Sequence, residues 1–454
     1  MASKTLKTQI WKMALSTMWD GGPGICHFAV TSSCNARCGF CSFALDRLPK
    51  EARHSVSLSE AKLACDILKR NGIRFLFFTG GEPLVHRDLV TMIAYATEVG
   101  MIATLVTNGW LLTPKRIDAL AHAGIQNVCI SIDAATAEAH DANRGLPGLT
   151  ERIRRANIAL RSHHIPITAS VTMSRLVDYS ALPSVMRNLG FDALTFSYPL
   201  RTLPSSYLAC ADSPLVDFTA EELHGAFEAI KTVSREFPVV NPIESIEDMQ
   251  RHLRNETEMF SCLAGWKSFY LDWHLQLWRC HHWDRPLCNI REFDGSQRIR
   301  DGCTACMIDC YRDASVMQHV GVAISDGVRA AVRGDFRRAW SHWSDRRNRI
   351  SLRAATRTAS SWMGSSKDAS DPTLEQRGSG SWSSLLITSS YRALNRFLVS
   401  GHSRVALLAQ SPLAAGLHLV GRNGPPAPAV SVAAVADPFC PGHLAKGTLK
   451  SRMR

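Results

Sequence analysis

A regular alternation of apolar runs and helical segments between residues 27 and 200 is the feature that most constrains this fold. Six short runs are rich in β-branched and aromatic residues, and segments with helix start signals separate them. One such segment begins with a capping-box pattern at Ser57 and Glu60, and another begins with Thr113 and Pro114. Strands that alternate with helices form parallel sheets. We expect strands at residues 27–34, 75–83, 102–109, 127–133, 167–173 and 193–199.

Polar or flexible residues stand at the ends of these runs. Sites in parallel α/β folds gather at the carboxyl ends of strands, whether the sheet is open or closed. The pattern therefore predicts one site that several strand ends share. The candidate residues are Cys34, Gly80, Gly81, Glu82, Pro83, Asn108, Ser131 and Asp133.

The rest of the chain divides by composition. The alternation stops near residue 215, helical stretches follow at 219–235 and 244–257, and a cysteine-rich region comes next. A basic helical stretch then leads into a Ser-rich tract that is typical of linkers or disorder. We expect an N-terminal amphipathic helix at 1–24, a core domain at 25–215, a cysteine-rich domain at 216–320, and a basic helix with a partly disordered tail at 321–454.

Charge and cysteine content limit the classes of function. The net charge is +12, but residues 329–454 hold 19 Lys and Arg against 6 Asp and Glu, and the preceding part is near neutral. We interpret the arginine-rich stretch 329–349 as a solvated helix face, with binding to acidic partners or nucleic acid as the alternative. The first residues lack the pattern of an export signal, which predicts a cytoplasmic protein with no transmembrane segment. The fourteen cysteines then favour metal binding or catalysis over disulfides.

Three cysteines lie within eight positions, at Cys34, Cys38 and Cys41. Iron–sulfur cubanes are normally held by four thiolates, so three thiolates leave one iron open to a ligand from outside the protein. Structural zinc requires four closed ligands, and His27 and His54 have no finger-like spacing. The spacing therefore favours a [4Fe-4S] cluster over zinc.

This loop, with Phe40 as its aromatic residue, resembles the Cys-x3-Cys-x-aromatic-Cys motif of the radical S-adenosylmethionine (radical SAM) superfamily. The resemblance implies an incomplete (β/α)6 parallel barrel. It also implies that S-adenosylmethionine chelates the open iron and is cleaved to methionine and a 5′-deoxyadenosyl radical, which abstracts hydrogen from a substrate.

Further residues follow the family pattern in order. "TGGEP", residues 79–83, resembles the motif that binds the methionine amino group, so the resemblance assigns Gly80, Gly81, Glu82 and Pro83 to that end of the cofactor. Ser131 and Asp133 correspond to ribose contacts, and Arg144 to a partner of the cofactor carboxylate. Asn108 is a candidate pocket residue, although a polar residue at a strand end also serves as a cap.

A second group of cysteines resembles the SPASM or twitch extension of radical SAM enzymes, which holds auxiliary iron–sulfur clusters. The spacing departs from the family pattern, so the sequence predicts at least one auxiliary cluster without fixing its ligands. A zinc ribbon is the alternative. The candidate ligands are Cys262, Cys280, Cys288, Cys303, Cys306 and Cys310.

These features predict a radical SAM enzyme that acts on a peptide or a small molecule, with a reductant such as flavodoxin or ferredoxin as partner. Two alternatives stay open at this point. One is an iron–sulfur electron carrier or zinc-stabilised binding protein without S-adenosylmethionine chemistry. The other is a radical SAM enzyme that modifies nucleic acid, which the near-neutral charge of the cysteine-bearing part disfavours.

Overall fold

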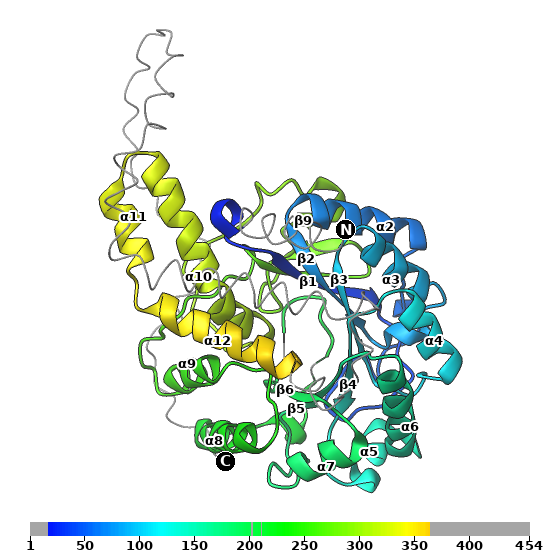
Figure 1. The fold of residues 1–454 in the computed structure, drawn as a ribbon. Coiled ribbons are helices and arrows are strands. Elements are labelled where there is room, and N and C mark those ends of the chain that lie inside the picture. Colours follow the sequence, from blue (N-terminus) through cyan, green and yellow to red (C-terminus); the bar gives the residue numbers. More distant parts are fainter. Residues whose placement is uncertain (1–16, 201–202, 210, 364–454) are drawn as a thin grey trace, which may run out of the picture. The chain divides into compact units, whose positions relative to one another are not determined.

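The structure is a computed structural model that describes residues 17–200, 203–209 and 211–363. The described residues lie in one compact unit. Its centre is a nine-stranded sheet in the order β6-β5-β4-β3-β2-β1-β7-β8-β9 (Figure 1). The strands β1 to β6 are neighbours in chain order and pair in parallel, and the sheet ends at the edge strands β6 and β9 without closing. This confirms the predicted α/β fold with an incomplete (β/α)6 barrel.

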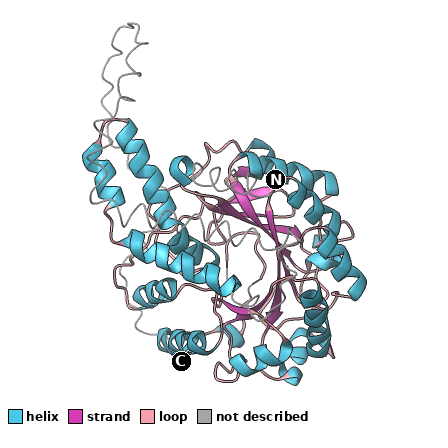
Figure 2. Cartoon of the chain, in the orientation of Figure 1, coloured by secondary structure: helices cyan, strands magenta, loops and turns pink. Residues whose placement is uncertain are grey.

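All six predicted strands form, within a few residues of the expected bounds. Figure 2 shows them as an inner layer, with helices on the outside. Each strand is short and strongly apolar because both faces of a parallel sheet are covered. The strands are β1 Gly24–Thr31, β2 Ile73–Gly80, β3 Ile102–Thr107, β4 Asn127–Ile132, β5 Ile167–Thr172 and β6 Ala193–Ser197.

The predicted helix starts are also confirmed. The Ser57 side chain accepts a hydrogen bond from the backbone N–H of Glu60, and the Glu60 carboxylate accepts one from the backbone N–H of Ser57. Thr113 caps the second predicted helix, with Pro114 in its first turn. The helices between the strands are α2 Leu58–Arg70, α3 Leu89–Glu98, α4 Pro114–His122, α5 Ala137–Arg144, α6 Leu149–Ser162 and α7 Leu182–Leu189; short 3-10 turns lie at Lys50–Ala52 and Pro83–Val85.

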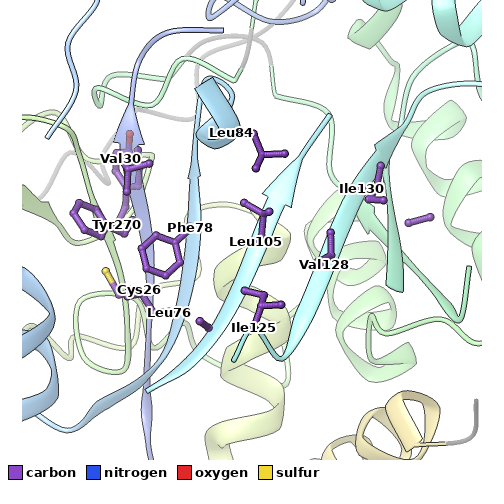
Figure 3. Packing of buried hydrophobic residues seen from close by; sticks show 14 of the residues in the cluster. Cys26, Val30, Leu76, Phe78, Leu84, Leu105, Ile125, Val128, Ile130 and Tyr270 are labelled. Atoms are coloured by element: carbon purple, nitrogen blue, oxygen red, sulfur yellow. The ribbon is translucent and has the colours of Figure 1, made fainter. Parts of the chain in front are cut away.

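The core lies between the strands and these helices. Val30, Phe78, Leu105 and Ile130, from four successive strands, are fully buried and contribute to one continuous cluster (Figure 3). Burial of each such side chain stabilises the fold by roughly 1.5–3 kcal/mol. Tyr270 of β7 joins the same cluster beside β1, so the core continues beyond the six parallel strands.

The second half of the described chain extends the same sheet. The strand β7 pairs in parallel with β1, and β8 and β9 add antiparallel partners. The sheet thus runs across the predicted division at 215/216, which stays a prediction. The elements are 3-10 turns Pro214–Val216 and Ile290–Glu292, strands β7 Ser268–Leu271, β8 Gln276–Trp278 and β9 Cys288–Asn289, and helices α8 Ala220–Glu236, α9 Ile243–Leu253, α10 Asp309–Val332, α11 Phe336–Trp343 and α12 Arg347–Met363.

Predictions for the two ends of the chain are only partly covered. Residues 17–20 are helical, and the remainder of the expected N-terminal helix lies outside the described residues. The Ser-rich tract that we expected to be linker or disorder begins at Thr358. Its first six residues, 358–363, are instead helical, because α12 extends to Met363. The predicted disorder beyond them lies outside the described part. Among the described residues, no helix has the length and apolarity that a membrane crossing requires.

Candidate functional site

The three-cysteine loop follows β1 and is held by hydrogen bonds to its backbone groups. The Arg47 guanidinium closes it, because Nη1 donates to the carbonyls of Cys38 (3.3 Å) and Cys41 (3.0 Å) and Nη2 donates to that of Gly39 (2.9 Å). The backbone N–H of Arg37 donates to the carbonyl of Arg144 at 2.8 Å. These bonds fix the loop at the carboxyl end of the sheet before any ligand is bound.

Gly80 and Gly81 end β2 where the chain passes against the start of the cysteine loop. A Cβ atom on Gly80 would lie 2.2 Å from the Thr31 carbonyl oxygen, and one on Gly81 would lie 2.2 Å from that of Ser33. The Gly81 and Glu82 N–H groups instead donate to these two carbonyls at 2.9 and 2.8 Å. Only glycine permits this approach, so the pair positions the cysteine loop.

Glu82 is buried, and the protein satisfies both of its carboxylate oxygens. Oε1 accepts from the Leu84 N–H (3.0 Å) and the Thr107 hydroxyl (2.7 Å), and Oε2 accepts from the Asn108 N–H (2.7 Å). Burial raises the pKa of Glu82, although these hydrogen bonds oppose the rise. Glu82 therefore joins the ends of β2 and β3 into one polar network.

Asn108 connects that network to the cysteine loop. Its Nδ2 donates to Asn35 Oδ1 at 2.8 Å, and its Oδ1 accepts from the Trp110 N–H at 2.9 Å. Asn35 directly follows Cys34 in the chain. The prediction that Asn108 belongs to the strand-end site is therefore consistent with its position, and the observed contact orients the loop.

Asp133 and Arg144 form a buried ion pair beside the loop. Arg144 Nε and Nη2 donate to the two Asp133 oxygens at 2.8 and 2.6 Å, and Asn143 Nδ2 adds a third bond at 2.7 Å. Burial alone would raise the pKa of Asp133, but Arg144 and His140 hold it below its usual value. The carboxylate is thus ionised and fixes the guanidinium in place.

Three other predicted residues take supporting positions. Ser131 is half-buried, and its hydroxyl donates to the Thr107 carbonyl of the neighbouring strand at 3.4 Å. Phe40 packs within the main core, and Pro83 is buried in the first turn after β2. Their predicted contacts with a cofactor stay predictions.

The three thiols of the loop lie close enough to influence one another. Burial raises the pKa of Cys34 to about 12, with further contributions from Glu82 and Cys38. Burial also raises the pKa of Cys41, and Cys38 and Cys34 raise it further. Arg144 opposes the rise at all three cysteines. One buried cation therefore faces a set of three thiols that are protonated when no metal is bound.

Four of the six cysteines in the second group form another set. Burial raises the pKa of Cys280 to about 12, with contributions from Cys306 and Cys262. It raises that of Cys306 to about 11, with contributions from Cys262 and Cys303. The Cys262 N–H donates to the Cys303 carbonyl at 2.8 Å. We call Cys262, Cys280, Cys303 and Cys306 the four-cysteine set.

Cys288 and Cys310 differ from this set in their electrostatic neighbours, although Cys310 packs against the same buried cluster as Cys303 and Cys306. Burial and the nearby Glu292 and Asp294 raise the pKa of Cys288 to about 11. The Cys310 thiol contacts Asp309 Oδ2 at 3.7 Å, and burial with that carboxylate raises its pKa. The charged neighbours that raise the pKa values of these two thiols are carboxylates, whereas other cysteines of the four-cysteine set raise the pKa values of Cys262, Cys280 and Cys306.

The donor types of both sets fit iron–sulfur clusters, which thiolates hold. Within the described ranges, no three or more His, Cys, Asp and Glu side chains are arranged to hold a metal ion, and the cysteines are free thiols. The sequence reasoning missed Asn35, Arg47 and Asn143. Asn143 accepts from the Gly39 N–H at 3.2 Å, so all three hold the loop. The Asn-Arg-Gly run beside Arg144 was the available signal for Asn143.

Comparison with known proteins identifies the domain. The model of the radical SAM superfamily matches residues 28–178. Over 161 residues the chain is 35% identical to an AdoMet-dependent heme synthase of Nitratidesulfovibrio vulgaris, covering 35% of this chain and 43% of that one. Over 148 residues it is 32% identical to a PqqA peptide cyclase of Rhodopseudomonas palustris, covering 32% and 38%. The matches thus span less than half the length of these curated relatives.

Solved structures are less similar. The crystal structure of Streptococcus suis SuiB bound to S-adenosylmethionine aligns with a TM-score of 0.45 and 14% identity, over 60% of this chain and 64% of that one. The family match covers β1 to β5 together with the cysteine loop, the Gly80–Gly81 turn and the Asp133–Arg144 pair. Residues 28–178, about a third of the chain, therefore match the radical SAM superfamily as a domain.

Proposed function

We propose that this protein is a radical SAM enzyme that cleaves S-adenosylmethionine reductively and abstracts hydrogen from a peptide or small-molecule substrate. The radical SAM family uses a [4Fe-4S] cluster together with S-adenosylmethionine. The observation that carries the proposal is the loop of Cys34, Cys38 and Cys41, held by protein hydrogen bonds beside Glu82 and Arg144. Three thiols at a strand end supply one ligand fewer than a closed cubane requires.

The three cysteines and the neighbouring Arg144 would have different roles. Cys34, Cys38 and Cys41 would hold the cluster and lose their protons on binding it. When bound, the reduced cluster supplies the electron that cleaves S-adenosylmethionine to methionine and a 5′-deoxyadenosyl radical. Arg144, whose positive charge faces all three sulfurs, would offset the negative charge of the thiolates.

The neighbouring strand ends would bind the cofactor. We infer that Gly80, Gly81, Glu82 and Pro83 line its methionine end, with Asn108, Ser131 and Asp133 along the same edge of the sheet. Arg144 gives Nε and Nη2 to Asp133. Nη1 is then the donor that it can direct to the cofactor carboxylate.

The four-cysteine set would hold an auxiliary iron–sulfur cluster. Four thiols match the normal ligand number of a cubane. The surroundings are apolar, because Cys262 and Cys280 form a buried cluster with Ile308 and Tyr311. A closed cluster in such a shell suits electron transfer, and the overall reaction requires a reductant such as flavodoxin or ferredoxin.

The relatives narrow the substrate only to a class. One set is named for heme synthesis and another for cyclisation of the PqqA peptide. The substrate of this chain is therefore proposed as a peptide or a small molecule.

The proposal is tested by anaerobic reconstitution with iron and sulfide, followed by dithionite and S-adenosylmethionine. The expected product is 5′-deoxyadenosine. If the clusters are intact by paramagnetic resonance and no 5′-deoxyadenosine forms, the protein is an electron carrier or binding protein instead.

A further inference from the structure

Exposed apolar side chains gather where α10 ends and α11 begins. Val332 is 70% exposed, Phe336 71% and Trp340 54%. Phe336 and Trp340 are four residues apart on α11 and so lie on one face. Scattered exposed apolar residues need no explanation, whereas a group of them marks an interaction surface.

The N-terminal segment adds to this group. Met18 and Trp19 are exposed, and the Trp19 carbonyl accepts from the Ser325 hydroxyl and from Arg329 Nη1, both at 3.0 Å. Ser325, Arg329 and Val332 follow one another on α10 at spacings of four and three residues, which places them along one face. Five of the eight exposed large hydrophobic residues of the described part therefore belong to residues 18–19, the end of α10 and α11.

The opposite side of α11 packs against α10, and this packing determines which face of α11 is exposed. Ala339 is fully buried, and Trp343 Nε1 donates to the Ile324 carbonyl at 3.4 Å. Trp343 lies over Gly327, where a Cβ atom would be 2.1 Å from Nε1. Figure 1 shows the two helices side by side at the edge of the fold, away from the parallel strands.

Arginines surround the apolar residues. Arg333, Arg337 and Arg338 are exposed, and no ion pair links any of them to another described residue. The nearby acidic groups are engaged, since Asp326 pairs with Arg300 and Arg329, and Asp335 caps α11. Among the described residues, these three arginines therefore have no acidic partner.

We propose that this surface docks on an anionic lipid bilayer. It consists of Met18, Trp19, Val332, Phe336 and Trp340 with Arg333, Arg337 and Arg338, and we call it the α10–α11 surface. Its composition is that of interfacial helices, in which aromatic and aliphatic side chains enter the headgroup boundary and basic residues contact acidic lipids. The protein would attach peripherally and would not cross the membrane.

Other partners fit this surface less well. A second copy of the chain would oppose arginines to arginines. Nucleic acid would satisfy the arginines and could stack on Trp19, Phe336 and Trp340, but it would leave the aliphatic Val332 and Met18 without an apolar partner. Lipid accounts for both the cationic and the aliphatic components.

Vesicle sedimentation of the full chain tests the proposal. The protein should bind vesicles made of equal parts phosphatidylcholine and phosphatidylglycerol, and bind poorly to phosphatidylcholine alone. The double variant Phe336→Ser/Trp340→Ser should weaken binding at least about tenfold, because apolar area no longer enters the bilayer. The triple variant Arg333→Gln/Arg337→Gln/Arg338→Gln should weaken it about a hundredfold at low salt.

Matched controls come from other faces of the protein. Ile158→Ser is the control for the Phe336→Ser/Trp340→Ser variant, because Ile158 is 61% exposed on α6. The exposed cations Arg70, Lys115 and Arg235 serve for the charges as a triple change to Gln. Neither control should alter binding by more than about twofold.

Three results would overturn the proposal. The first is that the full chain does not bind the anionic vesicles. The second is that both α10–α11 variants bind as tightly as the controls, which assigns binding to other basic residues. The third is that Phe336→Ser/Trp340→Ser abolishes self-association or RNA retention while vesicle binding persists, which identifies a different partner.

Discussion

The three-cysteine loop and the four-cysteine set are built in different ways from the same side chain. The loop takes three thiols from one short segment after β1, and it is held by Gly81 and Asn108, which follow β2 and β3, and by Asn143 of α5. The four-cysteine set collects thiols from positions 262 to 306, with a shell that contains Ile308 and Tyr311. Three ligands leave an iron open to a cofactor, whereas four close it.

One ion pair beside each set differs in how far it is exposed to water. Arg144 and Asp133 beside the loop are both buried. Arg279 beside the four-cysteine set is 2% exposed, but its partner Asp301 is 46% exposed. Water can therefore reach the carboxylate that pairs with Arg279 but not the one that pairs with Arg144.

The largest expected effect separates the two sets directly. Cys38→Ala should abolish 5′-deoxyadenosine formation and remove about four irons per chain, because two thiolates do not hold the first cluster. Cys306→Ala should remove a similar amount of iron yet retain cleavage of S-adenosylmethionine under dithionite. Iron and sulfide analysis with chromatography of the products measures both. Equal loss of cleavage in the two variants would contradict the division of roles.

The second-largest effect is expected when the buried Arg144 cation is removed. Arg144→Met leaves the Asp133 carboxylate buried without its partner and should destabilise the protein by about 3–5 kcal/mol. Urea unfolding of the iron-free protein at neutral pH measures the change. A second substitution, Asp133→Leu, should recover much of the loss, because no uncompensated charge is then left.

The pH dependence of that difference follows from the depressed pKa of Asp133. The ion pair stabilises the fold above the ordinary pKa of the group, about 3.9, and the stabilisation is lost as pH falls through the lower value in the folded protein. The gap between wild type and Arg144→Met should therefore shrink in acid. A gap that is unchanged on acidification would show that the charge of Asp133 is not its cause.

A smaller effect is expected at the partly exposed pair. Asp301→Asn removes the charge that Arg279 meets at 2.7 and 2.6 Å, and should cost about 1 kcal/mol because water reaches Asp301. The Arg279 guanidinium retains its contact with the Trp283 ring, whose centroid is 4.8 Å away. The same urea measurement applies. A loss as large as that of Arg144→Met would remove the contrast between the two sets.

The smallest expected effect defines the limits of the four-cysteine set. Cys288→Ser and Cys310→Ser should leave the iron content unchanged, since neither thiol lies among the four. Iron analysis and paramagnetic resonance after reconstitution provide the measurement. A loss of about four irons from either variant would show that the ligand set includes that cysteine.

Local sequence patterns were sufficient for much of the fold. The capping box at Ser57 and the cap at Thr113 are confirmed because such contacts involve residues three positions apart. The division at 215/216 is harder to predict, because β7 joins β1 across it by pairing distant segments. The exposed aromatic residues of α11 were equally invisible, since helical period does not say which face a neighbouring helix covers.

The sequence by itself determined the parallel α/β sheet, the three-cysteine loop and the strand ends around it, because spacing and period encode local geometry directly. Only the tertiary structure decided that Cys262, Cys280, Cys303, Cys306 and Cys310 gather at one buried cluster, that Arg144 is committed to Asp133, and that α11 presents Phe336 and Trp340 outward. Each of these depends on packing between segments far apart in the chain, and no short-range pattern specifies it.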